Sequence, residues 1–83
     1  MTKFDSPPLV FNVGDIVEEK SKQDEWTIYW VITKEYPIHY RKEDSGEILE
    51  VKGYSCFDLE DEENVLDQVV FRQSANWTYR KVT

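Results

Sequence analysis

Residues 26–33, with the sequence WTIYWVIT, decide the fold class. Every residue in this stretch is aromatic or β-branched, a composition that favours a pleated, half-buried strand. Side chains alternate between the two sides of a strand. One side here is wholly apolar and is expected to face the core: Trp26, Ile28, Trp30 and Ile32. The sequence therefore predicts a β-strand at this position.

Residues 11–17, FNVGDIV, precede this strand and contain a turn. Gly14 accepts a positive φ and Asp15 tolerates turn geometry, so we expect the chain to turn at this pair. A first strand is predicted to leave the turn at Ile16. The all-polar residues 21–25, SKQDE, are expected to form the loop that leads to the apolar strand.

A β-hairpin is predicted after the apolar strand. Its first strand is residues 36–42, YPIHYRK, which begins at an edge or a bulge because Pro37 has no N–H to donate. Residues 43–46, EDSG, form the turn, and residues 47–52, EILEVK, return as the second strand. Gly53 is expected to break this hairpin.

The segment 58–72 fits two structures. A strand is favoured by its β-branched and aromatic residues: Val65, Val69, Val70 and Phe71. A short helix near 58–68 is the alternative, because Asp58 can cap it and some apolar residues have helical spacing. Residues 54–59 before this segment have one fairly apolar side, and residues 77–82 are predicted to close the chain as a strand.

Five or six short strands with polar loops, and at most one short helix, predict an all-β protein, a small antiparallel barrel. Closing the sheet would remove its exposed edges, which so small a chain has little else to cover. We expect one domain over residues 11–83. Residues 1–10 are expected to be a flexible N-terminal segment, in which Pro7 and Pro8 make residues 6–8 extended or turn-like rather than helical.

The turn FNVGDIV followed by the strand WTIYWV resembles the start of Src-homology-3-like small barrels of the KOW and Tudor type, as found in small phage and bacterial proteins. The resemblance covers residues 11–34. It implies a barrel in which the Gly-Asp turn sets the first strand and the second strand carries core aromatics. It also implies a binding fold, without identifying a ligand, since a fold does not fix a function.

Composition excludes several classes of protein. The chain has 83 residues, a formal net charge of −7, 14 % aromatic residues, 1 Cys and 1 His. One Cys cannot form an internal disulfide, and one Cys with one His cannot build a four-ligand zinc site. No apolar run is long enough to cross a bilayer and no signal peptide is visible. We expect a soluble, cytoplasmic domain with no membrane contact.

Groups that carry chemistry are scarce. Nucleophilic catalysis would require Cys56 or a Ser beside a base, and the only His is His39, within a predicted strand. The 3 Gly residues are too few for a Gly-rich phosphate loop. A calcium loop at residues 58–64 would lack the usual Gly. We therefore predict no enzyme activity, no catalytic residue, no cofactor and no metal site.

Charge is concentrated in the middle of the chain. Residues 47–67 hold eight acidic residues and one basic residue, a net charge of −7. The core of this cluster is Glu60, Asp61, Glu62 and Glu63. Such a run is often only a solvated loop, but it also suits a negative face that steers a basic partner.

Aromatic residues supply two further candidate surfaces. Three tyrosines are candidates to anchor a protein partner beside the acidic face: Tyr36, Tyr40 and Tyr54. Residues 68–83 carry a charge of +3 and interleave basic and aromatic side chains, an arrangement that suits single-stranded nucleic acid. The candidates there are Arg72, Trp77, Tyr79 and Arg80. The net negative charge of the whole chain disfavours this second surface.

The sequence therefore predicts a non-enzymatic binding module, with an acidic face for a basic protein partner. One alternative is a small phage or mobile-element accessory protein that inhibits a nucleic-acid-binding host protein through a DNA-like acidic surface. A second alternative is nucleic-acid binding through the basic-aromatic C-terminal strand. The oligomeric state stays open.

Overall fold

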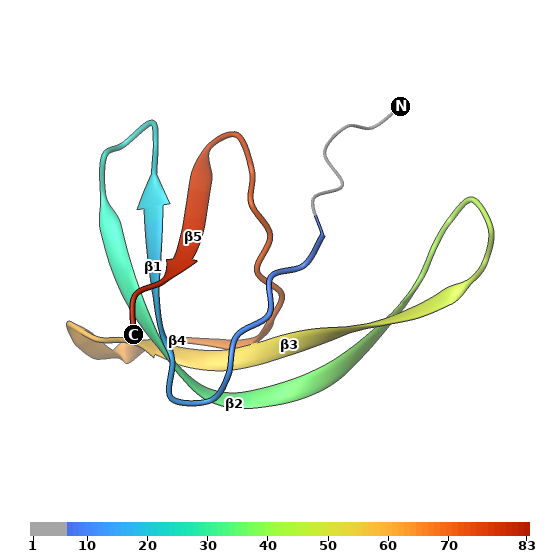
Figure 1. Ribbon diagram of the computed structural model, residues 1–83, viewed down its shortest axis with the longest axis horizontal. Helices are drawn as coiled ribbons and strands as arrows, with labels where there is room; N and C mark the ends of the chain where they lie inside the picture. The colour runs from blue at the N-terminus through green and yellow to red at the C-terminus, as the bar shows by residue number, and fades with distance from the viewer. Residues whose placement is uncertain (1–6) are drawn as a thin grey trace.

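The computed structural model describes residues 7–83 and shows five β-strands in one antiparallel sheet (Figure 1). The strands are β1 (Ile16–Ser21), β2 (Thr27–Arg41), β3 (Ile48–Asp58), β4 (Asp61–Val69) and β5 (Trp77–Lys81). Their spatial order is β4-β3-β2-β1-β5, so β1 to β4 form a meander and β5 returns to pair with β1. No helix occurs among residues 7–83, and the predicted all-β class is confirmed.

β4 settles the segment for which the sequence allowed two structures. Residues 58–68 contain no helix, and β4 pairs antiparallel with β3. The favoured strand is therefore confirmed and the helix alternative is wrong. Phe71, which the strand interpretation placed in the same element, lies beyond the end of β4 and is buried in the core.

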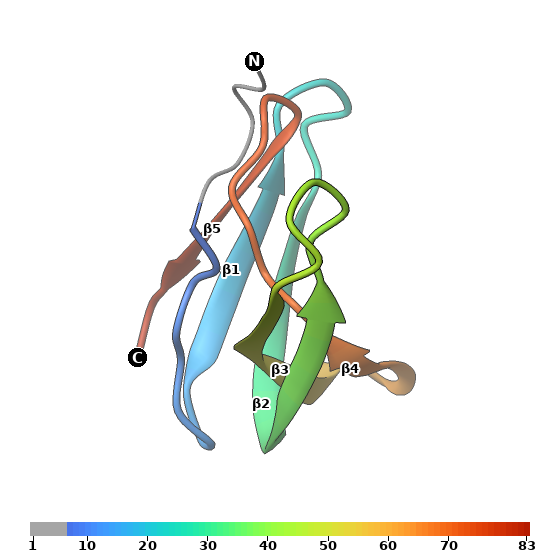
Figure 2. The same ribbon diagram turned by 90° about the vertical axis from the view of Figure 1, so that its right-hand side faces the viewer.

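The sheet curls around its core as in a small barrel, but it does not close (Figures 1 and 2). β4 and β5 are the two ends of the strand order, and within the described part of the chain they do not pair with each other. The prediction of a closed sheet is thus wrong, while the prediction of a small all-β domain with five or six strands is confirmed. The connection between β4 and β5 instead places Phe71 in the core between them.

β2 unites two strands that the sequence separated, the apolar stretch 26–33 and the stretch 36–42. Its pairing with β3 shifts between Ile32 and Lys34, so Thr33 is an extra residue at a β-bulge. A bulge bends and twists a strand without ending it. The proximal part of β2 can thus pair with β1 while the distal part continues beside β3 alone.

The prediction that Gly53 breaks the hairpin is wrong, because Gly53 lies within β3 opposite Tyr36. A Cβ at this position would lie 2.1 Å from Cδ1 of Ile38, whose side chain covers the glycine. Gly53 is therefore present because of close packing between the strands. Pro37 is likewise tolerated inside β2 because β1 pairs only with residues 27–31.

The distal halves of β2 and β3 form an arm that projects from the domain (Figure 1). Residues 36–41 pair with residues 48–53, and neither stretch has another strand beside it within residues 7–83. A cross-strand ion pair on the arm joins Lys52 to Glu35, and His39 lies 3.0 Å from Glu50 across the same two strands. The arm therefore has no core of its own and depends on its two strands alone.

Aromatic rings dominate the core on the inner side of the sheet. The buried apolar residues are Phe11, Val17, Trp30, Ile32, Tyr54, Cys56 and Phe71. The ring of Phe71 lies 5.7 Å from that of Phe11 and 5.0 Å from that of Tyr79. The predicted inner side of residues 26–33 is confirmed, with Trp30 and Ile32 buried and Trp26 and Ile28 half-buried.

The N-terminal segment falls only partly within the structure. Of the predicted flexible segment 1–10, residues 1–6 lie outside the described residues. The backbone N–H of Leu9 donates to the carbonyl of Phe71 at 2.8 Å, and the Leu9 side chain packs against the core. The next turn has the predicted form, with Gly14 at a φ of 96° and Asp15 accepting from the N–H of Asn12.

Candidate binding face on β3 and β4

The turn between β3 and β4 and the first residues of β4 present the acidic side chains to solvent. Asp58 accepts a hydrogen bond from the N–H of Glu60 at 2.9 Å, and Asp61 accepts from the N–H of Glu63 at 3.2 Å. These two carboxylates therefore shape the turn. The side chains of residues 60–63 are exposed, as the sequence predicted for an accessible acidic run.

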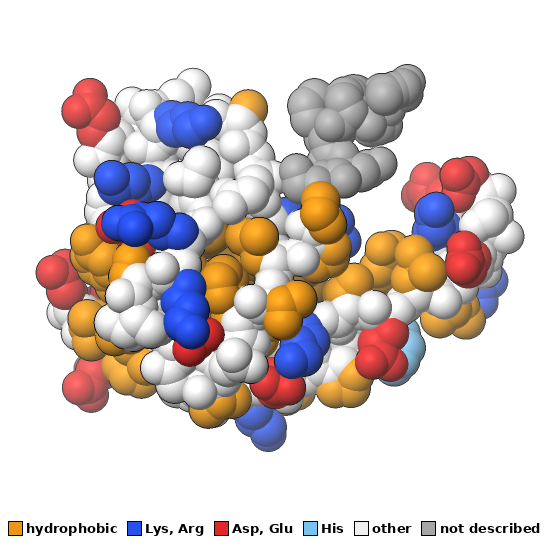
Figure 3. Space-filling model, viewed as in Figure 1, with side chains coloured by type: hydrophobic (Ala, Val, Ile, Leu, Met, Phe, Trp, Pro, Cys, Tyr) orange, Lys and Arg blue, Asp and Glu red, His pale blue; other side chains and the backbone are white. Residues whose placement is uncertain are grey.

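Irregular pairing pushes the acidic residues away from the sheet. Asp58 pairs with Asp61, but the next pair inward joins Phe57 to Val65. The three residues between Asp61 and Val65 have no partner on β3 and bulge outward. In Figure 3 acidic and apolar side chains lie next to each other at the end of the molecule that carries this turn.

Apolar side chains are exposed beside the acidic turn. Leu59 is 50 % exposed and Val65 is 60 % exposed. Phe57 is only half-buried, because β3 places Cys56 inward and its neighbours outward. The ring of Phe57 therefore joins the outer surface.

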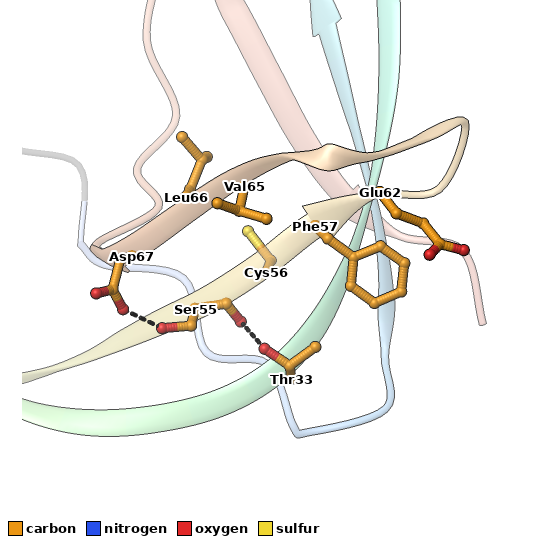
Figure 4. A pocket seen from close by; sticks show the side chains of 8 residues that line it. All are labelled: Thr33, Ser55, Cys56, Phe57, Glu62, Val65, Leu66 and Asp67. Atoms are coloured by element: carbon orange, nitrogen blue, oxygen red, sulfur yellow. Dashed lines mark hydrogen bonds between the residues drawn. The ribbon is translucent and has the colours of Figure 1, made fainter.

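A hollow of ≈ 440 Å³ lies on this part of the sheet (Figure 4). It is lined by Thr33, Ser55, Cys56, Phe57, Glu62, Val65, Leu66 and Asp67. Its size falls within the range of roughly 300–1,000 Å³ typical of ligand sites. Of these residues only Glu62 was predicted from the sequence as a binding residue. The sequence did contain one signal for this surface: Ser55 and Phe57 alternate with Tyr54 and Cys56, so the two pairs lie on opposite sides of the strand.

A small polar cluster lies at one end of the hollow. The hydroxyl of Ser55 donates to Oδ1 of Asp67, and the hydroxyl of Tyr36 lies 3.3 Å from the same oxygen. Thr33 Oγ1 donates to the carbonyl of Ser55 at 3.1 Å. The cluster holds the Asp67 carboxylate at the rim. The cluster contains no histidine, and the group that accepts the hydrogen bond of the Ser55 hydroxyl is the Asp67 carboxylate.

The three candidate tyrosines do not form one surface. Tyr36 belongs to the polar cluster, whereas Tyr40 lies on the arm and is 39 % exposed. Tyr54 is fully buried, which corrects its assignment to a partner surface. It shares the inner side of β3 with Cys56, and its hydroxyl oxygen accepts the N–H of Phe11 at 2.8 Å.

The distance along the arm also separates Tyr40 from the acidic run. Tyr40 pairs with Leu49, nine positions before Asp58 on β3. At about 3.3 Å per residue this separation is about 30 Å. Tyr36 is thus the one candidate tyrosine that lies beside the hollow.

The C-terminal candidates also divide between different environments. On β5 the ring of Tyr79 packs on Phe71 at the core, and Trp77 shares this side of the strand. Arg80 lies on the opposite side, where its Nε donates to Oε1 of Glu18 at 2.8 Å. Arg72 lies outside the strands and is half-buried. The arrangement brings no row of free aromatic and basic side chains together.

Cys56 and His39 are not placed together either. Cys56 pairs with Ile32 at the base of the sheet, while His39 contacts Glu50 on the arm at 3.0 Å. Burial raises the pKa of the Cys56 thiol to about 12, so the thiol stays protonated at neutral pH. Among residues 7–83, no three His, Cys, Asp or Glu side chains gather as a metal site.

No family model, curated protein or solved structure matches the chain. The resemblance to Src-homology-3-like barrels therefore stays a prediction. In the described part of the chain, no helix is long and apolar enough to span a membrane. The cytoplasmic location also stays a prediction.

Proposed function

We propose that the protein is a non-enzymatic binding module whose acidic face recognises a basic surface on a protein partner. The observation that carries the proposal is the exposed run of four acids from the β3–β4 turn into the start of β4, next to exposed Leu59 and Val65. Acidic side chains accelerate the encounter with a basic surface, and apolar side chains hold it after contact.

The distribution of charge supports this choice of partner. Between Gly53 and Phe71 the chain contains six acidic residues and no Lys or Arg. The basic residues of β5 are already engaged, since Arg80 pairs with Glu18 and Lys81 lies 3.5 Å from Asp15. The β3–β4 face therefore keeps an uncompensated negative charge, which favours a basic partner over a polyanion such as nucleic acid.

The test is capture of proteins from the source organism by the immobilised domain at low and high salt, followed by mass spectrometry. One variant combines Glu60→Gln, Asp61→Asn, Glu62→Gln and Glu63→Gln. Asn at position 61 keeps the oxygen that accepts from Glu63. The control variant combines Asp24→Asn, Glu43→Gln, Asp44→Asn and Glu47→Gln, all at exposed positions outside β3 and β4.

We expect basic proteins to be captured by the wild type and by the control variant, and to be lost from the variant at residues 60–63. Binding should weaken as salt rises, because exposed charges are screened. Capture that is equal for both variants would contradict the proposal.

A second candidate, inhibition of a nucleic-acid-binding protein by a DNA-like acidic surface, uses the same residues. It is favoured by the continuous exposure of the acids from Glu60 to Glu63. It adds one expectation: DNA should compete with the domain for the captured protein. A captured protein that binds DNA and the domain at the same time would exclude this candidate.

A further inference from the structure

The hollow on β3 and β4 combines apolar walls with carboxylates at two places on its rim. Phe57 and Val65 are paired in register and form part of the wall. Asp67 and Glu62 lie at opposite ends of the row of lining side chains (Figure 4). No Lys or Arg is among the lining residues.

Hydrogen bonds hold the carboxylate of Asp67 in place through only one of its two oxygens. Both of its hydrogen bonds, from Ser55 and from Tyr36, end on Oδ1. Within residues 7–83, Oδ2 therefore keeps its full capacity to accept a hydrogen bond. A carboxylate fixed by neighbours but open on one side is ready to receive a charged donor without losing further conformational freedom.

We propose that this hollow receives one arginine side chain of the protein partner. The proposal rests on the function proposed above, and it names the group that the acidic face recognises. An arginine has an aliphatic stem that packs along apolar walls and a planar guanidinium that pairs with carboxylates. The stem lies against Val65, the guanidinium reaches Oδ2 of Asp67, and the ring of Phe57 offers a face for stacking.

Charge complementarity excludes the other chemistries. An acidic or phosphate-bearing group meets Asp67 and Glu62 with no Lys or Arg among the lining residues. An uncharged aliphatic side chain packs against the apolar wall but leaves the two carboxylates without a cationic partner. A second copy of this chain brings a net charge of −7 of its own, which opposes association.

The test uses the isotope-labelled domain and a short peptide, acetyl-Gly-Leu-Arg-Leu-Gly-amide, followed by amide chemical shifts. The Arg position is replaced in turn by Lys, by citrulline, which is a neutral analogue of arginine, and by Glu. We expect the Arg peptide to shift the amides of Ser55, Phe57, Val65 and Asp67. Replacement by citrulline should weaken binding by about ten-fold, because the positive charge strengthens the hydrogen bond to Oδ2 of Asp67.

Two variants separate the contacts. Asp67→Asn removes the charge but keeps Oδ1 for Ser55 and Tyr36, and it should weaken the Arg peptide by about ten-fold. Asp44→Asn, with the same change of charge near the tip of the arm, should leave affinity unchanged. Phe57→Leu keeps the wall apolar and should reduce the preference for Arg over Lys. The spectra of the free variants verify that each is folded.

Equal affinity for the Arg and citrulline peptides would overturn the proposal, as would unchanged affinity in Asp67→Asn. Shifts confined to other parts of the sheet, or self-association of the domain that Asp67→Asn abolishes, would also overturn it. If the wild type ignores the Arg peptide while the variant at residues 60–63 still loses its basic partner, only the arginine assignment fails. If the Arg peptide binds as expected but that variant keeps its partner, the proposed function fails.

Discussion

The two ends of the sheet, β4 and β5, differ in what protects their open edges. At β5 the side chain of Gln73 accepts from the N–H of Tyr79 at 2.9 Å and donates to its carbonyl at 2.8 Å. The N–H of Ser74 also donates to the carbonyl of Trp77 at 3.1 Å. The chain thus covers this edge with its own polar groups, as a neighbouring strand would.

At β4 the protection is charge and irregularity. β4 carries Asp61, Glu62, Glu63 and Asp67 and no basic residue. Its pairing with β3 shifts twice, and Gln68 has a φ of 55°. Charges and bulges discourage the pairing of two identical edges. An edge covered by its own polar groups cannot pair with any other strand. An acidic edge repels acidic partners but stays accessible to basic ones.

The largest effect is expected from Phe71→Ala, which removes the anchor of the segment that covers β5. Deleting a buried aromatic side chain costs about 3–5 kcal/mol of unfolding free energy. Urea denaturation measures this loss, and hydrogen exchange should show the amide of Tyr79 opening first. Val65→Ala at an exposed position on β4 is the control and should change stability by less than about 0.5 kcal/mol. Equal losses would show that the two ends do not differ.

Gln73→Ala tests directly whether the side chain of Gln73 protects the edge of β5. It leaves the N–H and carbonyl of Tyr79 without their partner, and the expected loss is about 1–3 kcal/mol. The uncovered edge should also make the protein associate at high concentration, as measured by sedimentation. Gln73→Glu keeps an acceptor for the N–H and should lose less than Gln73→Ala. A monomeric Gln73→Ala variant of unchanged stability would contradict the role of the cover.

A smaller effect is expected from acid, and it concerns β5 more than β4. Arg80, which donates a hydrogen bond to Glu18, lowers the pKa of this carboxyl below its ordinary value of 4.5. A lowered pKa in the folded state means that the contact stabilises the fold above pH 4.5 and is lost as the pH falls through the folded value.

Glu18→Gln should therefore flatten the acid side of the stability profile measured by urea unfolding. Asp44→Asn, at an exposed position without such a partner, is the comparison. If the two variants have the same acid profile, the Glu18–Arg80 contact does not secure β5.

The smallest effect is expected from Gln68→Gly on β4. A left-handed conformation costs an ordinary residue about 1–2 kcal/mol, and glycine avoids this cost but loses more chain entropy. The net gain in stability should be no more than about 1 kcal/mol, without any change in the exchange of the Tyr79 amide. A loss of stability would mean that the Gln68 side chain contributes contacts of its own.

Some parts of the fold followed from local sequence. The apolar side of residues 26–33 predicted which residues of β2 face the core, and Trp30 and Ile32 are buried there. The β-branched residues near Val65 predicted a strand where a helix was also open. Both predictions depend on periodicity and side-chain shape, which are properties of neighbouring residues.

Other parts depended on residues far apart in the chain. From the sequence alone Gly53 suggests the end of a strand. In the structure the side chain of Ile38 covers Gly53, which explains the glycine within β3. Tyr54 suggests a surface anchor until the N–H of Phe11 is seen to donate to its hydroxyl, 43 residues away in sequence. Neither partner has a local signature, so no pattern around these residues predicts the contact.

The sequence by itself determined the all-β class, the inward side of β2 and the exposed acidic run, because each follows from local periodicity or from the cost of burying charge. Only the tertiary structure decided that the sheet stays open, that Gln73 covers one of its ends, and that Asp67, Phe57 and Val65 surround one hollow. These features arise where strands meet, at bulges and register shifts set by packing over the whole sheet.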